Sequence, residues 1–152
     1  MPLSQLLFSF QGRINRKPWW LVGLALLGIM LVLSVVAAVF AGSAILNDDP
    51  MAMIGALGGM VIFFLVLMVP LIWIGLALGA KRLHDRNKSA WWLLVFYVLP
   101  GVVDGIGSSV GLSTIFSLVA FALSIWGLVE MGFLRGTVGP NQYGPDPLGA
   151  QA

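Results

Sequence analysis

The densest polar run in this chain of 152 residues, residues 81–89, holds four basic residues, one histidine and one aspartate. Asp85 follows Lys81 by four positions and Arg82 by three, so a helix would place the acid and both bases on one face. A buried aspartate beside an arginine stays ionised and orients the guanidinium group. Such a unit can bind a phosphate-bearing headgroup or the acidic tail of a partner protein. The alternative is a solvated basic loop between two membrane spans, in which Asp85 has no defined partner.

Two further ionisable residues are candidates for chemistry. His84 is the only histidine, and without cysteine or a neighbouring pair of carboxylates it is a poor metal ligand. It is better suited to capping a helix end or to sensing pH near neutrality. Glu130 is an acid inside the last predicted span, which makes it a candidate for function. Because Asp104 lies near the opposite membrane face, no chain of acids crosses the bilayer. We therefore favour an ion pair of Glu130 with Arg82 or Arg135 over a proton relay.

Several signatures of catalysis and transport are missing from the sequence. There is no cysteine, no phosphate-binding glycine loop, no His-Glu-x-x-His pair, no nucleophile elbow and no run typical of a selectivity filter. We therefore expect a protein that is not an enzyme, with no catalytic residue, no cofactor and no metal site. Its basic residues lie at the ends of spans, which indicates contact with lipid headgroups and not with nucleic acid.

The composition indicates an integral membrane protein. Hydrophobic residues make up 59% of the chain and charged residues 9%, whereas soluble domains have about 45–50% and about 25%. A hydrocarbon core of about 30 Å needs roughly 20 apolar helical residues. The apolar runs predict an all-α, four-helix bundle in the membrane, as a single domain over residues 1–152. The predicted spans are residues 19–46, 51–80, 91–107 and 110–134. The third is the shortest, because Asp104 interrupts its apolar run.

The distribution of charge predicts the orientation. With four spans, all eight Lys and Arg residues fall on one side of the membrane, and the other side carries Asp48, Asp49 and Asp104. Cytoplasmic loops carry the excess of Lys and Arg, so both termini should be cytoplasmic. The first apolar run is about twice the length of a signal-peptide core, which favours an uncleaved membrane anchor.

Two segments should lie outside the bilayer. Leu3, Leu6, Leu7 and Phe10 share one helical face, which predicts a short interfacial helix within residues 1–18. In the segment 136–152, half of the residues from 136 to 149 are Gly or Pro, so this tail should form successive turns. The sequence leaves open whether the tail is free or folds back onto the basic loop.

Three motifs together resemble the small bacterial inner-membrane proteins of the domain-of-unknown-function family 805. They are Phe-Gln-Gly-Arg-Ile-Asn-Arg at residues 10–16 with the tryptophan pair at 19–20, the run from 81 to the tryptophan pair at 91–92, and the Gly-Pro-Asn-Gln-Tyr-Gly segment that starts at 139. The family has no established activity. The resemblance implies an inner-membrane location and a cytoplasmic polar assembly of the residues that these motifs share. With Arg86 added, the predicted assembly is Arg13, Arg16, Arg82, His84, Asp85, Arg86, Asn141 and Tyr143.

The functional interpretation that we favour is a non-enzymatic binding or interaction module. Its cytoplasmic basic face would engage an anionic lipid headgroup or a partner protein, with homo-oligomerisation as a further option. A second interpretation is a small transporter or channel subunit that works as an oligomer, with Pro70 and Glu130 as the residues of interest. A third is a membrane-embedded enzyme that uses His84 and Asp85.

Overall fold

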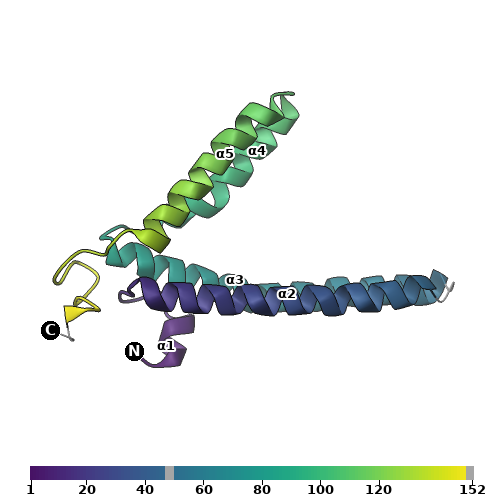
Figure 1. Ribbon diagram of the computed structural model, residues 1–152, viewed down its shortest axis with the longest axis horizontal. Helices are drawn as coiled ribbons and strands as arrows, with labels where there is room; N and C mark the ends of the chain where they lie inside the picture. Colours follow the sequence, from purple (N-terminus) through teal and green to yellow (C-terminus); the bar gives the residue numbers. More distant parts are fainter. Residues whose placement is uncertain (47–49, 150–152) are drawn as a thin grey trace. The chain divides into compact units, whose positions relative to one another are not determined.

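The computed structural model describes residues 1–46 and 50–149, and within them the chain is helical with no β-strand (Figure 1). The predicted all-α class is therefore confirmed. The single β-bridge among these residues joins Asn141 to Gly144 in the tail. The elements in order are α1 (Leu3–Phe8), α2 (Arg16–Leu46), α3 (Pro50–Asp85), the π-helix η1 (Leu94–Val98), α4 (Leu99–Ser109), α5 (Ser113–Leu128) and the π-helix η2 (Val129–Phe133).

Three of these helices are long and apolar enough to cross a membrane. They are α2, α3 and the continuous helix Ser113–Phe133 that α5 and η2 form. The third predicted span, residues 91–107, corresponds to a shorter apolar helix, Leu94–Ser109, and Trp91 lies in the turn before it. Its 16 residues span about 24 Å at 1.5 Å per residue, which is less than a hydrocarbon core of about 30 Å. Asp48 and Asp49, predicted to end the first span, lie outside the described residues.

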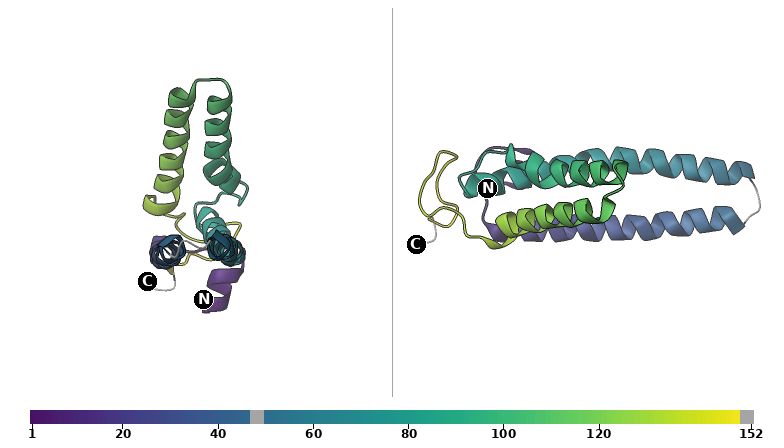
Figure 2. Two further views of the ribbon diagram at one scale, coloured as in Figure 1. Left: turned by 90° about the vertical axis from the view of Figure 1, so that its right-hand side faces the viewer. Right: turned by 90° about the horizontal axis from the view of Figure 1, so that it is seen from above.

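The chain divides into two compact units, and each is described by itself. The second unit, residues 21–75, contains the apolar parts of α2 and α3, which lie side by side (Figure 2). Pro70 lies inside α3. Most apolar side chains of this unit face outward, as expected for helices that a bilayer covers. A groove of about 280 Å³ between the helices is lined by apolar residues that include Leu33, Phe40, Met60 and Phe63.

The first unit, residues 1–20 with 76 onward, contains a helical hairpin of α4 and α5 (Figure 2). Gly111 adopts a φ of +73° in the turn between them, a conformation that favours glycine. The hydroxyl of Ser117 in α5 donates to the carboxylate of Asp104 in α4. Asp104 therefore lies inside α4 and joins the two helices, whereas its charge alone suggests the end of a span.

A small apolar core fixes the end of α3 against the two π-helices. The buried residues of this core are Ala80, Leu83, Leu93, Phe96 and Met131. They come from α3, from the start of the helical hairpin and from η2. Burial of this apolar surface holds the polar run of α3 beside the chain that follows η2.

The last turn of α3 ends in a Schellman motif. Asn87 has a φ of +57°, and its N–H donates to the carbonyl of His84 at 3.0 Å. The N–H of Lys88 reaches back to the carbonyl of Leu83 at 2.9 Å. Asparagine tolerates this left-handed conformation at a helix end better than most residues. Helix α3 thus continues through the polar run as far as Asp85, which gives Arg82 and Asp85 a defined i, i+3 relationship.

Candidate functional site

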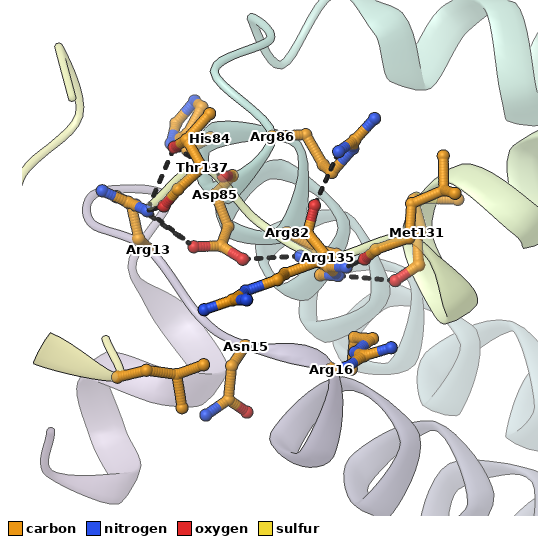
Figure 3. A network of polar contacts seen from close by, with 12 residues as sticks. Arg13, Asn15, Arg16, Arg82, His84, Asp85, Arg86, Met131, Arg135 and Thr137 are labelled. Atoms are coloured by element: carbon orange, nitrogen blue, oxygen red, sulfur yellow. Dashed lines mark hydrogen bonds and ion pairs between the residues drawn. The ribbon is translucent and has the colours of Figure 1, made fainter. Parts of the chain in front are cut away.

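Asp85 lies at the centre of a buried charge cluster (Figure 3). Its Oδ1 atom accepts hydrogen bonds from Nε and Nη2 of Arg13, at 3.2 and 3.0 Å. Its Oδ2 atom accepts from Nη1 of Arg82 at 2.6 Å. The three side chains are at most 4% exposed. Two guanidinium groups therefore share one carboxylate away from water, and their other donors need acceptors within the protein.

Arg13 finds those acceptors in the C-terminal tail. Its Nη2 atom donates to the carbonyl of Thr137 at 2.6 Å and to the Thr137 hydroxyl at 3.1 Å. Its Nη1 atom donates to the carbonyls of Gly139 and Gly144 at 2.8 and 3.1 Å. The tail is therefore folded onto the body of the first unit. Of the two arrangements that the sequence leaves open, the structure has the docked one.

Arg82 and two residues at the start of α2 occupy the carbonyls at the end of η2. A helix end leaves its last carbonyls without partners in the helix. Arg82 donates from Nε to the carbonyl of Met131 at 2.6 Å, and from Nη2 to that of Leu134. Arg16 donates to the carbonyl of Phe133 at 2.8 Å, and the Trp20 indole donates to that of Gly132 at 3.0 Å. The four acceptors are consecutive: Met131 and Leu134 for Arg82, Phe133 for Arg16 and Gly132 for Trp20.

The chain after η2 approaches Asp85 more closely than a side chain would permit. A Cβ atom added to Gly136 would lie 1.9 Å from Oδ2 of Asp85. The next residue, Thr137, donates its N–H and its hydroxyl to the Asp85 carbonyl, at 2.8 and 3.0 Å. Glycine at 136 therefore lets the tail start directly over the carboxylate.

His84 serves as a docking surface for the tail. Its ring stacks on Tyr143 with the centroids 3.9 Å apart and the planes 4° from parallel. Its Nδ1 atom lies 3.2 Å from the carbonyl of Gly12, and its own carbonyl accepts from the Asn141 amide at 2.9 Å. In the described part of the chain, no group of three His, Asp or Glu side chains is arranged to hold a metal ion.

Lys81 holds the N-terminal helix. Its ammonium group donates to the carbonyls of Gln5 and Ser9 at 2.8 and 2.7 Å, and also to that of Leu6. These carbonyls lie in and just after the single short helix α1. The spacing in the sequence suggests Asp85 as the neighbour of Lys81, but the structure directs this lysine to α1 instead. Phe10, expected on the same helical face as Leu3, lies beyond α1 and packs on the core.

Glu130 forms ion pairs, but not with the residues expected from the sequence. Its Oε1 atom lies 2.9 Å from Nε of Arg86 and 2.9 Å from Nζ of Lys88, in place of Arg82 or Arg135. Arg82 is not available to Glu130, because it is already bonded to Asp85 and to the end of η2. The ammonium of Lys88 also lies 4.5 Å from the ring centre of Trp92, at cation–π distance.

The structure thus brings most of the predicted assembly together, but some of its side chains are buried and others are exposed to solvent. One connected network holds Arg13, Arg82, His84, Asp85, Asn141 and Tyr143. Arg86 lies beside it, with Glu130 and the Arg135 carbonyl as acceptors. Arg16 is exposed. The sequence predicts no role for Lys88, Gly136, Thr137 or Trp20. Thr137 and Trp20 donate to backbone carbonyls, which leave no motif, and the fold places Lys88 and Gly136 beside the carboxylates of Glu130 and Asp85.

The exposed cations line two adjoining pockets. We call the larger one, about 560 Å³, the basic pocket; its wall contains Asn15, Arg16, Lys17, Trp20, Gly132 and Leu148. Among residues 1–46 and 50–149, no carboxylate lines it. The smaller pocket, about 220 Å³, shares Asn15, Arg16 and Leu148 with it, and adds Arg135 and the carboxylates of Asp85 and Asp146.

Asp146 organises the last turn of the tail. Its carboxylate accepts from the N–H groups of Leu148 and Gly139, both at 2.9 Å. These two hydrogen bonds to the charged form lower the pKa of Asp146 from its ordinary value. The turn therefore depends on the ionised carboxylate.

Comparison with known proteins identifies the family. The model of a protein family described as "Protein of unknown function (DUF805)" matches residues 7–145. The chain belongs to the DUF805 family. Two relatives, both named Uncharacterized protein YiiR, come from Escherichia coli K12 and from Escherichia coli O157:H7. Each is 32% identical to this chain, over 96% of this chain and 90% of the relative. No solved structure matches the chain. The matched DUF805 region contains the whole Asp85 network.

Proposed function

We propose that this DUF805 protein is a non-enzymatic binding module of the bacterial inner membrane. In this proposal both termini are cytoplasmic, and the basic pocket binds the phosphate of an anionic lipid headgroup. The observation that carries the proposal is the exposure of Arg16 and Lys17 at a pocket whose described wall has no carboxylate, while Arg13, Lys81 and Arg82 are buried and bonded.

The distribution of donors supports the choice of residues. From composition alone, Arg13, Arg16, Arg82 and Arg86 are equal candidates for a headgroup. Arg13 and Arg82 are enclosed, and Arg86 is bonded to Glu130. Arg16 commits only Nη1, to Phe133, which holds the guanidinium in place and leaves its other nitrogens available. An oriented arginine beside a lysine suits a phosphate group, because charge-assisted hydrogen bonds to phosphate are strong and directional.

The surroundings of the pocket suit the headgroup region. The Trp20 indole forms part of the wall and donates to Gly132. Tryptophan is enriched where a span leaves the hydrocarbon, and anionic lipids attract Lys and Arg at that level. Trp20 and Lys17 lie in the first turns of α2, where the polar residues give way to the long apolar run.

The charges of the described residues support the orientation. Every Lys and Arg belongs to the N-terminal segment, the end of α3 with its following loop, or the residue pair after η2. Asp104 lies in α4, five residues before its last residue, Ser109, and away from the end that follows the basic loop. This asymmetry is the one expected when the basic end faces the cytoplasm.

Transport through Glu130 is less well supported. Two cations hold this carboxylate at 2.9 Å each, and it is 5% exposed. The structure therefore favours a structural ion pair over a titrating relay. Glu130→Gln in proteoliposomes should leave proton and ion flux at the background of protein-free vesicles, as in the wild type. A wild-type flux that this substitution abolishes would support transport instead.

The experiment for the lipid proposal is native mass spectrometry of the full-length protein in detergent. The probes are phosphatidylglycerol and phosphatidylcholine of equal chain length. We expect at least tenfold preference for phosphatidylglycerol in the wild type, and loss of that preference in the double variant Arg16→Gln/Lys17→Gln. Arg135→Gln is the matched control, since this exposed arginine lines the pocket that also contains two carboxylates. A double variant that keeps the preference would overturn the proposal, and so would equal binding of both lipids by the wild type.

A further inference from the structure

A second, apolar pocket lies in the same unit, and the proposed binding of a headgroup does not involve it. Its volume is about 360 Å³, and its wall contains Trp19, Phe96, Pro100, Ser124, Leu128 and Met131. We call it the apolar pocket. Pockets that hold small organic ligands are typically about 300–1,000 Å³, so both this pocket and the basic pocket are of that size.

The lining of the apolar pocket suits a hydrocarbon chain. It contains no charged residue. Its two hydroxyl groups are directed to protein acceptors: Ser124 donates to the carbonyl of Ala120 at 3.0 Å, and the Tyr97 hydroxyl lies 4.0 Å from the Met131 sulfur. An apolar chain would leave none of these groups without a partner, so it fits the pocket at no cost in hydrogen bonds.

The apolar pocket and the basic pocket share a wall. Trp19 lines the first and Trp20 the second, and the two indoles pack edge to face with their centroids 5.0 Å apart. Their common support is η2, in which Met131 faces the apolar pocket and Gly132 faces the basic one. A Cβ atom on Gly132 would lie 2.9 Å from Trp20 and 3.2 Å from Trp19. The tryptophan pair is therefore in contact with the η2 backbone, and the two pockets lie on either side of it.

This arrangement places an anion site at the polar end of a hydrocarbon site. We propose that the ligand of the basic pocket is an amphiphile, whose phosphate contacts Arg16 and Lys17 while one acyl chain occupies the apolar pocket. The inference rests on the function proposed above and narrows its ligand. A soluble phosphate compound has the same anionic chemistry, but it leaves the apolar pocket unused. A phospholipid occupies both.

The test separates the two pockets with two kinds of variant. Ser124→Phe fills the apolar pocket, and Ser124→Ala keeps it open and serves as the control, because the hydroxyl bonds only to its own helix. Leu128→Phe narrows the same pocket from another position. Far-ultraviolet circular dichroism shows which variants fold. If only one of Ser124→Phe and Leu128→Phe folds, that variant provides the test.

The probes are long-chain phosphatidylglycerol, dihexanoyl phosphatidylglycerol and glycerol phosphate, each titrated against the full-length protein in detergent. We expect the wild type to bind the long-chain lipid at least tenfold more tightly than glycerol phosphate. Ser124→Phe should lose that advantage and keep its weak affinity for glycerol phosphate, while Ser124→Ala should match the wild type.

Failure of the inference can be distinguished from failure of the proposed function. If filling the apolar pocket leaves long-chain binding unchanged, or if glycerol phosphate binds as tightly as the lipid, the amphiphile inference is wrong and the anion site stands. If Arg16→Gln/Lys17→Gln binds all three probes as the wild type does, the anion site itself is wrong.

Discussion

Arg13 and Asp85 lie 72 residues apart in the chain, yet two nitrogens of the Arg13 guanidinium contact one oxygen of Asp85, at 3.2 and 3.0 Å. The same guanidinium reaches three carbonyl groups of the tail. One side chain before α2 thus joins the end of α3 to the C-terminal segment. Arg13 therefore gives the polar end of the protein a defined fold. In that fold some arginines are buried, and others stay exposed and available to a ligand.

Asp85→Asn should destabilise the protein strongly. The substitution leaves Arg13 and Arg82 buried without their shared counter-charge, and removing one partner of a buried ion pair costs about 3–5 kcal/mol. Chemical denaturation in detergent, followed by tryptophan fluorescence, measures the change. Asp104→Asn is the matched control, because this exposed acid forms no ion pair within residues 1–46 and 50–149, and the asparagine amide oxygen can still accept the hydrogen bond from Ser117. A loss below about 1 kcal/mol, the usual value for exposed pairs, would show that the cluster contributes little.

Gly136→Ala should release the tail from the body of the first unit. Its Cβ atom has no room beside the Asp85 carboxylate, so either the carboxylate or the tail must move. Overpacking of this kind costs about 1–3 kcal/mol. Limited proteolysis of the tail reports the release as a faster cut. Gly101→Ala in α4 is the control, because nothing lies within 4 Å of its added Cβ. Equal cutting rates in the two variants would count against a tail fixed over Asp85.

The turn at Asp146 should depend on pH in one direction. Its pKa is lowered in the folded protein, so the carboxylate stabilises the turn above the ordinary pKa of 3.8. That contribution is lost as the pH falls through the lowered folded value. Proteolytic protection of the tail, measured with an acid-active protease, should stay constant from pH 8 to 5 and then decrease.

Asp146→Asn removes this dependence on ionisation. The variant should show a less protected tail already at neutral pH, since its amide is a weaker acceptor for the N–H groups of Gly139 and Leu148. A variant tail as well protected as that of the wild type would indicate that the contacts with Arg13, His84 and Asp85 hold it without Asp146.

The predicted orientation places Ser109 and Val138 on opposite sides of the membrane. The chain has no native cysteine, so single cysteines need no background removal. Both positions are exposed. A thiol reagent that does not cross membranes should label position 109 in intact cells and position 138 only in inverted vesicles. Labelling of position 109 from the cytoplasmic side alone would show that the short helix Leu94–Ser109 does not cross, and the four-span topology would fail.

The fold class and much of the polar assembly follow from sequence because their signals are local. Apolar runs of sufficient length predict helices, and the i, i+3 spacing of Arg82 and Asp85 predicts their pairing. The family motifs add Arg13 and Tyr143 to the same end. The sequence does not delimit the short helix Leu94–Ser109 well, because the charge of Asp104 indicates the end of a span, whereas Asp104 accepts a hydrogen bond within the hairpin.

The functional division among the basic residues could not be read from the sequence. Lys81 and Arg16 are equally basic in the chain, but Lys81 is buried against α1 and Arg16 is exposed. The difference arises because Lys81 bonds to backbone carbonyls of a distant segment. Every residue has a backbone carbonyl, so the sequence does not show which ones will accept a hydrogen bond from Lys81. Glu130 pairs with Arg86 and Lys88, and not with Arg82 or Arg135 as the sequence suggests, because Arg82 is already bonded to Asp85 and to the carbonyl of Met131.

In the proposed function, the basic pocket holds an anionic lipid in the cell. A photo-crosslinking amino acid at Asn15, in the wall of that pocket, tests the claim in living bacteria, with the same probe at exposed Val138 as the control. After irradiation and purification, mass spectrometry identifies what is attached. The account predicts an anionic phospholipid bound at position 15 and not at position 138. Attachment of a protein, or of zwitterionic and anionic lipid in their bulk ratio, would contradict it.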